Sequence, residues 1–169
     1  MNILICAESF YPEINGVSSV ITNLAREFIK KNFNVSVATK KISNRKKLNI
    51  NKKEVKVHQF DIKGNLVRGI AGEKKKYTDF LRKSNYDIIF FYAAQQWSFD
   101  LALPLLDKLK AKICFAPCGF SRLNNFFYQN YFRLLFNKIK FCDSEIFHSK
   151  YYQDYLICKK KRDVSFPLR

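Results

Sequence analysis

The residues with the clearest chemical potential lie in a loop near the start of the chain. Asn15 and Gly16 stand directly before a predicted helix and follow the loop residue Pro12. A flexible Asn-Gly pair at this point lets backbone N–H groups and the positive end of the helix dipole face a phosphate. The pattern is not a dinucleotide fingerprint, because G-x-G-x-x-G is absent, and it lacks the GK[ST] ending of a P-loop. Alternatively, Gly16 is an ordinary turn glycine.

The elements that would position this loop follow from the alternation of apolar and amphipathic segments. The pattern predicts strands at 2–7, 33–39, 55–62, 86–94, 111–116, 145–148 and 164–167. It predicts helices at 17–31, 70–83, 98–110, 123–141 and 151–158. Strands that alternate with helices and are buried on both faces predict an α/β fold, a Rossmann-like doubly wound parallel sheet. The most apolar strand, YDIIFFYAA at 86–94, is expected in the middle of the sheet.

Such a sheet also predicts where ligands bind, namely beyond the carboxyl ends of its strands. The segments that would meet at this edge are 8–18, 93–98, 117–122 and the residues around Ser149.

Composition narrows the class of protein. The 169 residues carry 31 Lys and Arg against 14 Asp and Glu, a net charge of +17, and 47% of them are hydrophobic. No apolar run is long enough to span a membrane, and the start has no basic region typical of a secretory signal. Five cysteines without a repeated CxxC pair favour a reducing, cytoplasmic environment. Two histidines leave little for a metal site.

The excess of positive charge has two explanations. It can serve to attract a polyanionic partner, or it can result from a composition that is rich in Lys, Asn, Ile and Phe throughout. The basic residues between 40 and 56 and the run at 159–162 are expected to be solvated loops. Because zinc-finger spacing, zipper heptads and an RNP-like strand are absent from the sequence, we expect no nucleic-acid partner.

Several segments, taken in order, resemble the N-terminal domain of glycosyltransferase family 4, which has the GT-B architecture. The opening NILICAESFYPEINGVSSVITNLAREFIKKNFNVSVATK contains NGV at 15–17, LAREF at 24–28 and VSVAT at 35–39. Later segments that fit are YDIIFFY at 86–92, APCGFSRL at 116–123 and CDSEIFHSKYYQDYL at 142–156. The last one is similar to a family segment through Asp143, Ile146, Ser149 and Leu156. The resemblance covers nearly the whole chain.

The resemblance implies half of a two-domain enzyme. Residues 1–169 would form the acceptor-side domain, and the C-terminal domain that holds most of the nucleotide-sugar donor would be missing. The chain would then be a fragment or would work with a partner subunit, and alone it would be inactive. The family typically retains anomeric configuration and needs no bound metal. The implied partners are the nucleotide-sugar, which is a co-substrate rather than a cofactor, and a sugar or lipid-linked acceptor.

The resemblance also implies roles for individual residues. Asn15 and Gly16 match the position that approaches the donor diphosphate. The candidates for acceptor binding are Gln95, Gln96, Trp97, Gly119, Phe120, Arg122, Ser149 and Lys150. The segment at 92–97 lacks the histidine that the family often carries there, so no catalytic base is assigned. Alternatively, the residues at 95–97 cap the helix that follows.

The segment at 122–141 combines many aromatic residues with charges that are all basic. Such a helix can lie on an anionic membrane surface, or its aromatic face can pack beneath the sheet. Two functions therefore stay open. One is the acceptor-side domain of a glycosyltransferase that builds a surface polysaccharide or glycolipid, cytoplasmic or peripheral on the inner face of the membrane. The other is a non-catalytic subunit that binds an acceptor or a membrane and needs a partner chain.

Overall fold

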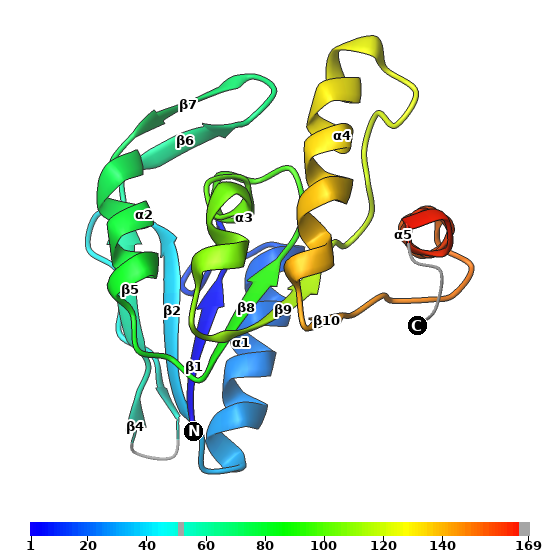
Figure 1. Ribbon diagram of the computed structural model, residues 1–169. Helices are drawn as coiled ribbons and strands as arrows, with labels where there is room; N and C mark the ends of the chain where they lie inside the picture. The colour runs from blue at the N-terminus through cyan, green and yellow to red at the C-terminus, as the bar shows by residue number, and fades with distance from the viewer. Residues whose placement is uncertain (51–52, 166–169) are drawn as a thin grey trace.

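A six-stranded parallel sheet organises the chain (Figure 1). The computed structural model describes residues 1–50 and 53–165. The strand order is β10-β9-β8-β1-β2-β5, and each neighbouring pair is parallel. The strands are β1 (Asn2–Cys6), β2 (Asn34–Lys40), β5 (Lys56–Phe60), β8 (Ile88–Tyr92), β9 (Lys112–Ala116) and β10 (Ser144–Glu145). The predicted Rossmann-like α/β fold is confirmed, and β8 lies in the interior of the sheet as its apolar sequence predicted.

Helices cover both faces of the sheet. In Figure 1, α1 (Gly16–Lys30) lies behind it, and the other face carries α2 (Lys74–Lys83), α3 (Trp97–Asp100) and α4 (Gln129–Lys138). Successive strand residues point to opposite faces, so each strand feeds two cores. Ile3 and Ile5 join the core under α1, whereas Leu4 and Cys6 join the core on the other side.

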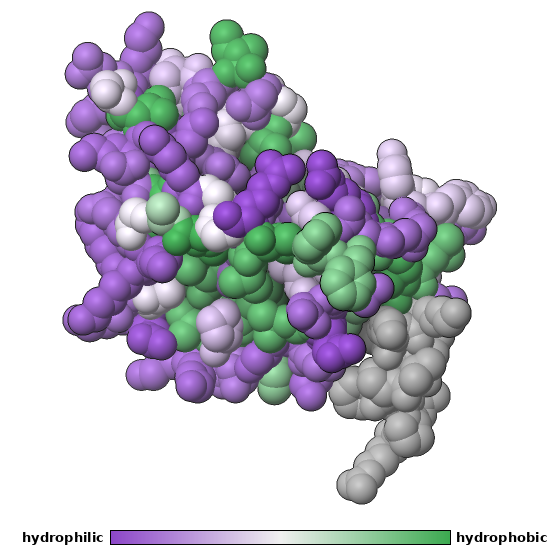
Figure 2. All heavy atoms as spheres, turned by 90° about the horizontal axis from the view of Figure 1, so that it is seen from above, coloured by the Kyte–Doolittle hydropathy of each residue, from purple (hydrophilic) through white to green (hydrophobic). Residues whose placement is uncertain are grey.

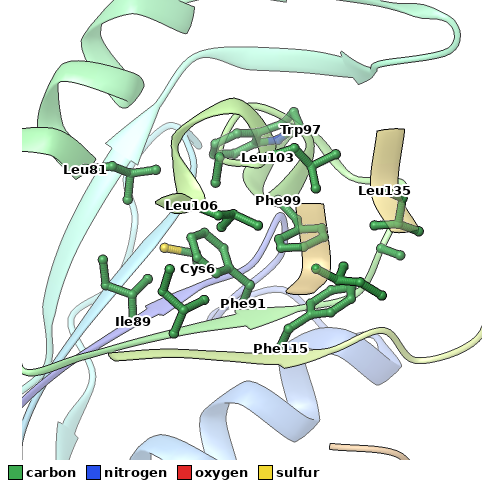
Figure 3. Close-up of a cluster of buried hydrophobic side chains, with 14 of the residues drawn as sticks. Cys6, Leu81, Ile89, Phe91, Trp97, Phe99, Leu103, Leu106, Phe115 and Leu135 are labelled. Atoms are coloured by element: carbon green, nitrogen blue, oxygen red, sulfur yellow. The ribbon is translucent and has the colours of Figure 1, made fainter. Parts of the chain in front are cut away.

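Aromatic rings fill the larger of these two cores (Figure 3). Phe99 stacks on Phe115 with ring centroids 3.9 Å apart, and Phe91 packs against Phe99 at 5.3 Å. Figure 3 shows Leu103, Leu106 and Leu135 closing over these rings. The aromatic content of the sequence is therefore used largely in packing α3, α4 and the 3-10 helix η1 (Leu103–Lys108) against the sheet.

Several predicted helices are shorter than expected. The helix expected at 70–83 begins only at Lys74, because β6 (Ile62–Asn65) and β7 (Gly69–Gly72) pair as an antiparallel hairpin. The helix expected at 98–110 is divided into α3 and η1, with Pro104 in the first turn of η1. The helix expected at 123–141 consists of η2 (Phe126–Tyr128), α4 and η3 (Ile139–Phe141).

Two predictions about charged and terminal segments are corrected. The basic segment at 40–56 is not a plain solvated loop, since it contains β3 (Asn49–Ile50) and β4 (Lys53–Glu54) and buries Leu48 and Ile50. The run at 159–162 and residues 164–165 belong to α5 (Gln153–Ser165), so these residues are helical rather than a loop or a strand. The rest of the strand expected at 164–167 lies outside the described residues.

The β6–β7 hairpin gives a test of this fold. Gly69 and Gly72 both have positive φ, at 90° and 103°. A Cβ on Gly72 would lie 1.9 Å from the carbonyl oxygen of Asp61, whereas one on Gly69 would meet nothing within 4 Å. We expect backbone strain of about 1–2 kcal/mol from Gly69→Ala. Gly72→Ala should lower the free energy of unfolding further, because the backbone must also move. Urea unfolding of both variants would measure the difference, and equal midpoints would contradict the hairpin geometry.

Candidate functional site

The loops that follow β1, β8 and β9 meet at the carboxyl edge of the sheet, as the parallel topology requires. The Glu8 N–H donates to Gln96 Oε1 at 3.3 Å, which joins the loop after β1 to the loop after β8. Ala94 N donates to the Pro117 carbonyl at 3.0 Å, which joins the loops after β8 and β9. Figure 2 looks down on this end of the molecule and shows apolar side chains gathered in the middle of the view with polar ones around them.

The loop before α1 is held by its own polar side chains. Asn15 Oδ1 accepts a hydrogen bond from Ser18 N at 2.9 Å and so caps the helix, while its Nδ2 donates to Ser9 Oγ at 2.7 Å. Ser9 Oγ in turn donates to Glu13, whose other carboxylate oxygen lies 2.7 Å from Lys40 Nζ. Asn15 therefore shapes the loop, and its side chain is already engaged.

Gly16, the first residue of α1, is open to solvent. A Cβ at this position would meet nothing within 4 Å, and the φ angle of Gly16 is not positive. Ser18 N is capped by the Asn15 side chain and Ser19 N donates to the Asn15 carbonyl. The N–H groups of Gly16 and Val17 are those that helix geometry leaves for water or a ligand. The fold itself thus does not require glycine here, whereas a ligand that approaches the backbone closely would.

Arg45 braces the same loop from the basic segment that was expected to be solvated. Its guanidinium donates to the backbone carbonyls of Phe10, Tyr11 and Lys40, and its Nε donates to Gln59 Oε1 at 2.9 Å. Composition gave no signal for this role, because Arg45 is one of many basic residues in its segment.

Backbone strain is concentrated in the loops after β8 and β9. Ala93, Gln95, Cys118 and Arg122 have φ between 58° and 69°, a region that residues other than glycine rarely adopt. The two loops hold each other in this conformation, since Gln95 Nε2 donates to the Ser121 carbonyl at 2.9 Å and Ser121 N donates to Gln95 Oε1 at 2.8 Å. Strain of this kind persists where the surroundings over-determine it, and it is frequent at ligand sites.

A buried polar chain lies beneath these loops. Gln95 N donates to Tyr131 Oη at 2.9 Å, and Tyr131 donates to Asp100 Oδ1 at 3.0 Å. The other Asp100 oxygen accepts from Leu66 N at 2.8 Å. Asp100, which is only 1% exposed, therefore connects the loop after β8, α4 and the β6–β7 hairpin.

The carboxylates near this edge differ in acidity. Burial raises the pKa of Glu8, against the opposing effect of Lys40. Burial raises the pKa of Asp100 to about 6, although the hydrogen bonds from Leu66 and Tyr131 oppose the shift and the charge of Glu8 adds to it. In contrast, the hydrogen bonds from Lys40 and Ser9 outweigh partial burial and lower the pKa of Glu13.

The structure separates the predicted acceptor residues into two groups. Trp97 is fully buried against Tyr77 and Phe60, so its ring offers no surface for a sugar. Phe120 is 9% exposed and packs against Phe132 and Phe136, and its remaining surface lines a hollow beside Arg122. Trp97 is therefore withdrawn from the predicted site, whereas Phe120 stays at its margin.

The remaining acceptor candidates stay near the surface, but some of their polar groups are in use. Gln95 joins the two strained loops, and Gly119 N donates to the buried Asp154 at 3.0 Å. Gln96 and Ser149 are half-buried, whereas Arg122 and Lys150 are exposed. The residues that the sequence missed are Glu8 and Asp100. Glu8 directly follows the first strand segment, so the sequence placed it at the carboxyl end of a strand. A single acidic residue at that position matches no catalytic or binding motif, and it was therefore not predicted as a site residue.

Comparisons with known proteins give this chain no family. A scan against models of protein families finds no match, and a search of curated proteins likewise finds none.

Two further findings concern residues 1–50 and 53–165. None of their helices is both long and apolar enough to cross a bilayer. Within the same ranges, His, Cys, Asp and Glu side chains form no group of three or more that could hold a metal ion.

The buried carboxyl group of Asp100 gives a prediction for pH. Its folded-state pKa lies above its unfolded value of about 3.8, so the folded chain binds its proton first as the pH falls. As the pH falls from 6 to 4, the free energy of unfolding of the wild type should therefore rise by up to about 3 kcal/mol relative to that of Asp100→Asn. The variant is the reference because its amide does not titrate. Urea unfolding of both proteins across this range would measure the difference.

Asp143→Asn is a control of opposite sign. Hydrogen bonds from Lys112 and from Ile113 N lower the pKa of Asp143, so the wild type should lose stability relative to this variant on acidification. Parallel pH profiles for the wild type and Asp100→Asn would contradict the assignment of Asp100.

Proposed function

We propose that this chain is the acceptor-side domain of a retaining, nucleotide-sugar-dependent glycosyltransferase that builds a surface polysaccharide or glycolipid. The proposal joins the sequence resemblance to glycosyltransferase family 4 with the geometry of the carboxyl edge. In this proposal the second half of the cleft, with most of the donor site, comes from another α/β domain.

The observation that carries the proposal is the open position of Gly16. Glycine is not required there by backbone conformation or by packing, yet it leaves the first N–H groups of α1 accessible at the edge where ligands bind in sheets of this type. A donor diphosphate that accepts from Gly16 N and Val17 N would need this close approach. Asn15 contributes by capping the helix rather than by touching the phosphate.

The acceptor would lie across the strained loops after β8 and β9. With Trp97 withdrawn and Phe120 largely packed, the candidates that still present polar groups are Gln96, Arg122, Ser149 and Lys150. Arg122 and Lys150 suit an acceptor that carries a phosphate, because charge-assisted hydrogen bonds to phosphate are strong. Glu8 is the acidic group of this edge, and its raised pKa lets it hold a proton more readily than an exposed glutamate.

The test is sugar transfer with a substituted Gly16. The chain is combined with the donor-binding domain that the proposal requires and assayed with UDP- and GDP-sugars and lipid extract. Gly16→Trp should lower transfer by on the order of 10²-fold, because the indole displaces the diphosphate from the helix N-terminus. The variant should keep its fold, since a side chain at this position meets open space.

The control is Asn23→Trp, which places the same indole at an exposed position further along α1. It should transfer sugar as the wild type does. Equal turnover by Gly16→Trp and the wild type would refute the donor-phosphate role of Gly16. Absence of transfer by the combined wild-type domains would favour the alternative function, a non-catalytic subunit that binds an acceptor.

A further inference from the structure

The start of α4 presents two phenylalanines that the core does not use. Phe126 and Phe127 are 77% and 79% exposed, and their rings contact each other edge to face with centroids 6.0 Å apart. Most other aromatic residues of the same segment are covered, because Tyr128, Tyr131 and Phe132 pack into the core beneath. The helix as a whole therefore cannot lie with its aromatic face in a bilayer, and only its beginning remains available.

The two phenylalanines are held in place without being buried. Asn125 Oδ1 accepts from Phe127 N at 3.0 Å and caps the turn, and Tyr128 N donates to the Asn125 carbonyl at 2.9 Å. Figure 1 shows that α4 begins at the top of the molecule, beyond the carboxyl ends of the strands. The pair therefore occupies a protruding and well-defined tip.

A polar hollow lies next to this tip on the same segment. It has a volume of about 470 Å³ and is lined by Phe120, Arg122, Leu123, Asn124, Asn125 and Gln153. Its lining contains an arginine and three amides but no carboxylate. Asp154, which follows Gln153, is buried and accepts from Gly119 N, so its charge is not presented at the surface. The hollow suits an anionic group the size of a phosphate ester.

The surrounding sequence has one sign of charge. Seven Lys and Arg lie between Asp107 and Asp143, and no Asp or Glu does. Arg122 and Arg133 are both exposed, one before the phenylalanine pair and one about two turns after it. Four residues of chain span at most about 14 Å, so the Arg122 hollow and Phe126 fall within the dimensions of one lipid headgroup and the acyl region beneath it.

The geometry points to a membrane-contact site, in which Phe126 and Phe127 enter the acyl region of an anionic bilayer while the Arg122 hollow takes a lipid phosphate. Aromatic side chains beside basic ones are the combination that binds anionic lipid surfaces. Proteins that bind single-stranded nucleic acid stack successive bases on aromatic side chains along a basic groove. One protruding pair of phenylalanines does not form such a row, so a bilayer is the better match. The inference does not depend on the proposed transferase function.

Vesicle co-sedimentation tests the site. The full chain should bind phosphatidylcholine vesicles more tightly when phosphatidylglycerol is included. The double substitution F126S/F127S should reduce this binding about tenfold or more, because the inserted apolar surface is lost. Arg122→Gln should reduce it about fivefold, the effect of one basic residue near the surface.

Two variants serve as matched controls. Phe141→Ser removes a 40% exposed phenylalanine in η3, just beyond the other end of α4, whose ring lies beneath the amino groups of Lys138 and Lys140. Lys31→Gln removes one positive charge from the exposed end of α1. Both should bind vesicles as the wild type does, which would separate this site from the general charge of +17.

A tryptophan reporter gives a second measurement that needs only one conservative change. The native Trp97 is buried, so Phe127→Trp adds an exposed fluorophore at the tip. Its emission should shift to the blue and be quenched by brominated lipid in anionic vesicles.

Four results would overturn the site: equal binding to neutral and anionic vesicles, wild-type binding by F126S/F127S, an unshifted reporter, or full release by soluble glycerol phosphate. Displacement of the reporter from vesicles by single-stranded DNA at low concentration would assign the tip to nucleic acid instead.

Discussion

Every strand of the central sheet runs in the same direction, and most of the structure follows from this constraint. Parallel strands need crossover connections, which supply the helices that bury both faces of the sheet. The same direction brings the loops after β1, β8 and β9 to one edge, where backbone hydrogen bonds and the Gln95–Ser121 pair join them. The position of the candidate site is therefore set by the direction of the strands, and the individual side chains only decide what the site can bind.

The polar groups beneath that edge explain why its loops can hold an uncommon conformation. Gln95, Tyr131 and Asp100 form a buried chain of hydrogen bonds that ends on the β6–β7 hairpin. Partners of this kind compensate for the positive φ angles in the loops after β8 and β9. Arg45 holds the loop before α1 through the Phe10 carbonyl and ties it to β2 through the Lys40 carbonyl. The edge is thus pre-organised, with Gly16 at its open point.

The aromatic and basic composition divides between two uses. Most rings of α3, α4 and η1 pack in the core. The aromatic face of the segment at 122–141 is therefore largely buried and cannot lie along a membrane surface, which the sequence alone had allowed. What remains outside is the Phe126–Phe127 pair beside the Arg122 hollow. The donor site that we propose at Gly16 and the membrane site that we infer at the tip both lie beyond the carboxyl ends of the strands (Figure 1). This placement would keep a bound acceptor lipid close to the edge where chemistry is proposed.

The sequence by itself determined the fold class and the interior position of β8 in the sheet, because apolar periodicity is a local signal. It also placed Gly16 and the loops after β8 and β9 at one edge, since parallel topology fixes that result. Only the tertiary structure decided which side chains remain exposed and which are buried or hydrogen-bonded within the protein. Trp97 and Phe120 are covered by rings distant in sequence, and Asp100 finds its partners on the hairpin and on α4. Burial and pairing depend on contacts between segments far apart in the chain, which no local pattern encodes.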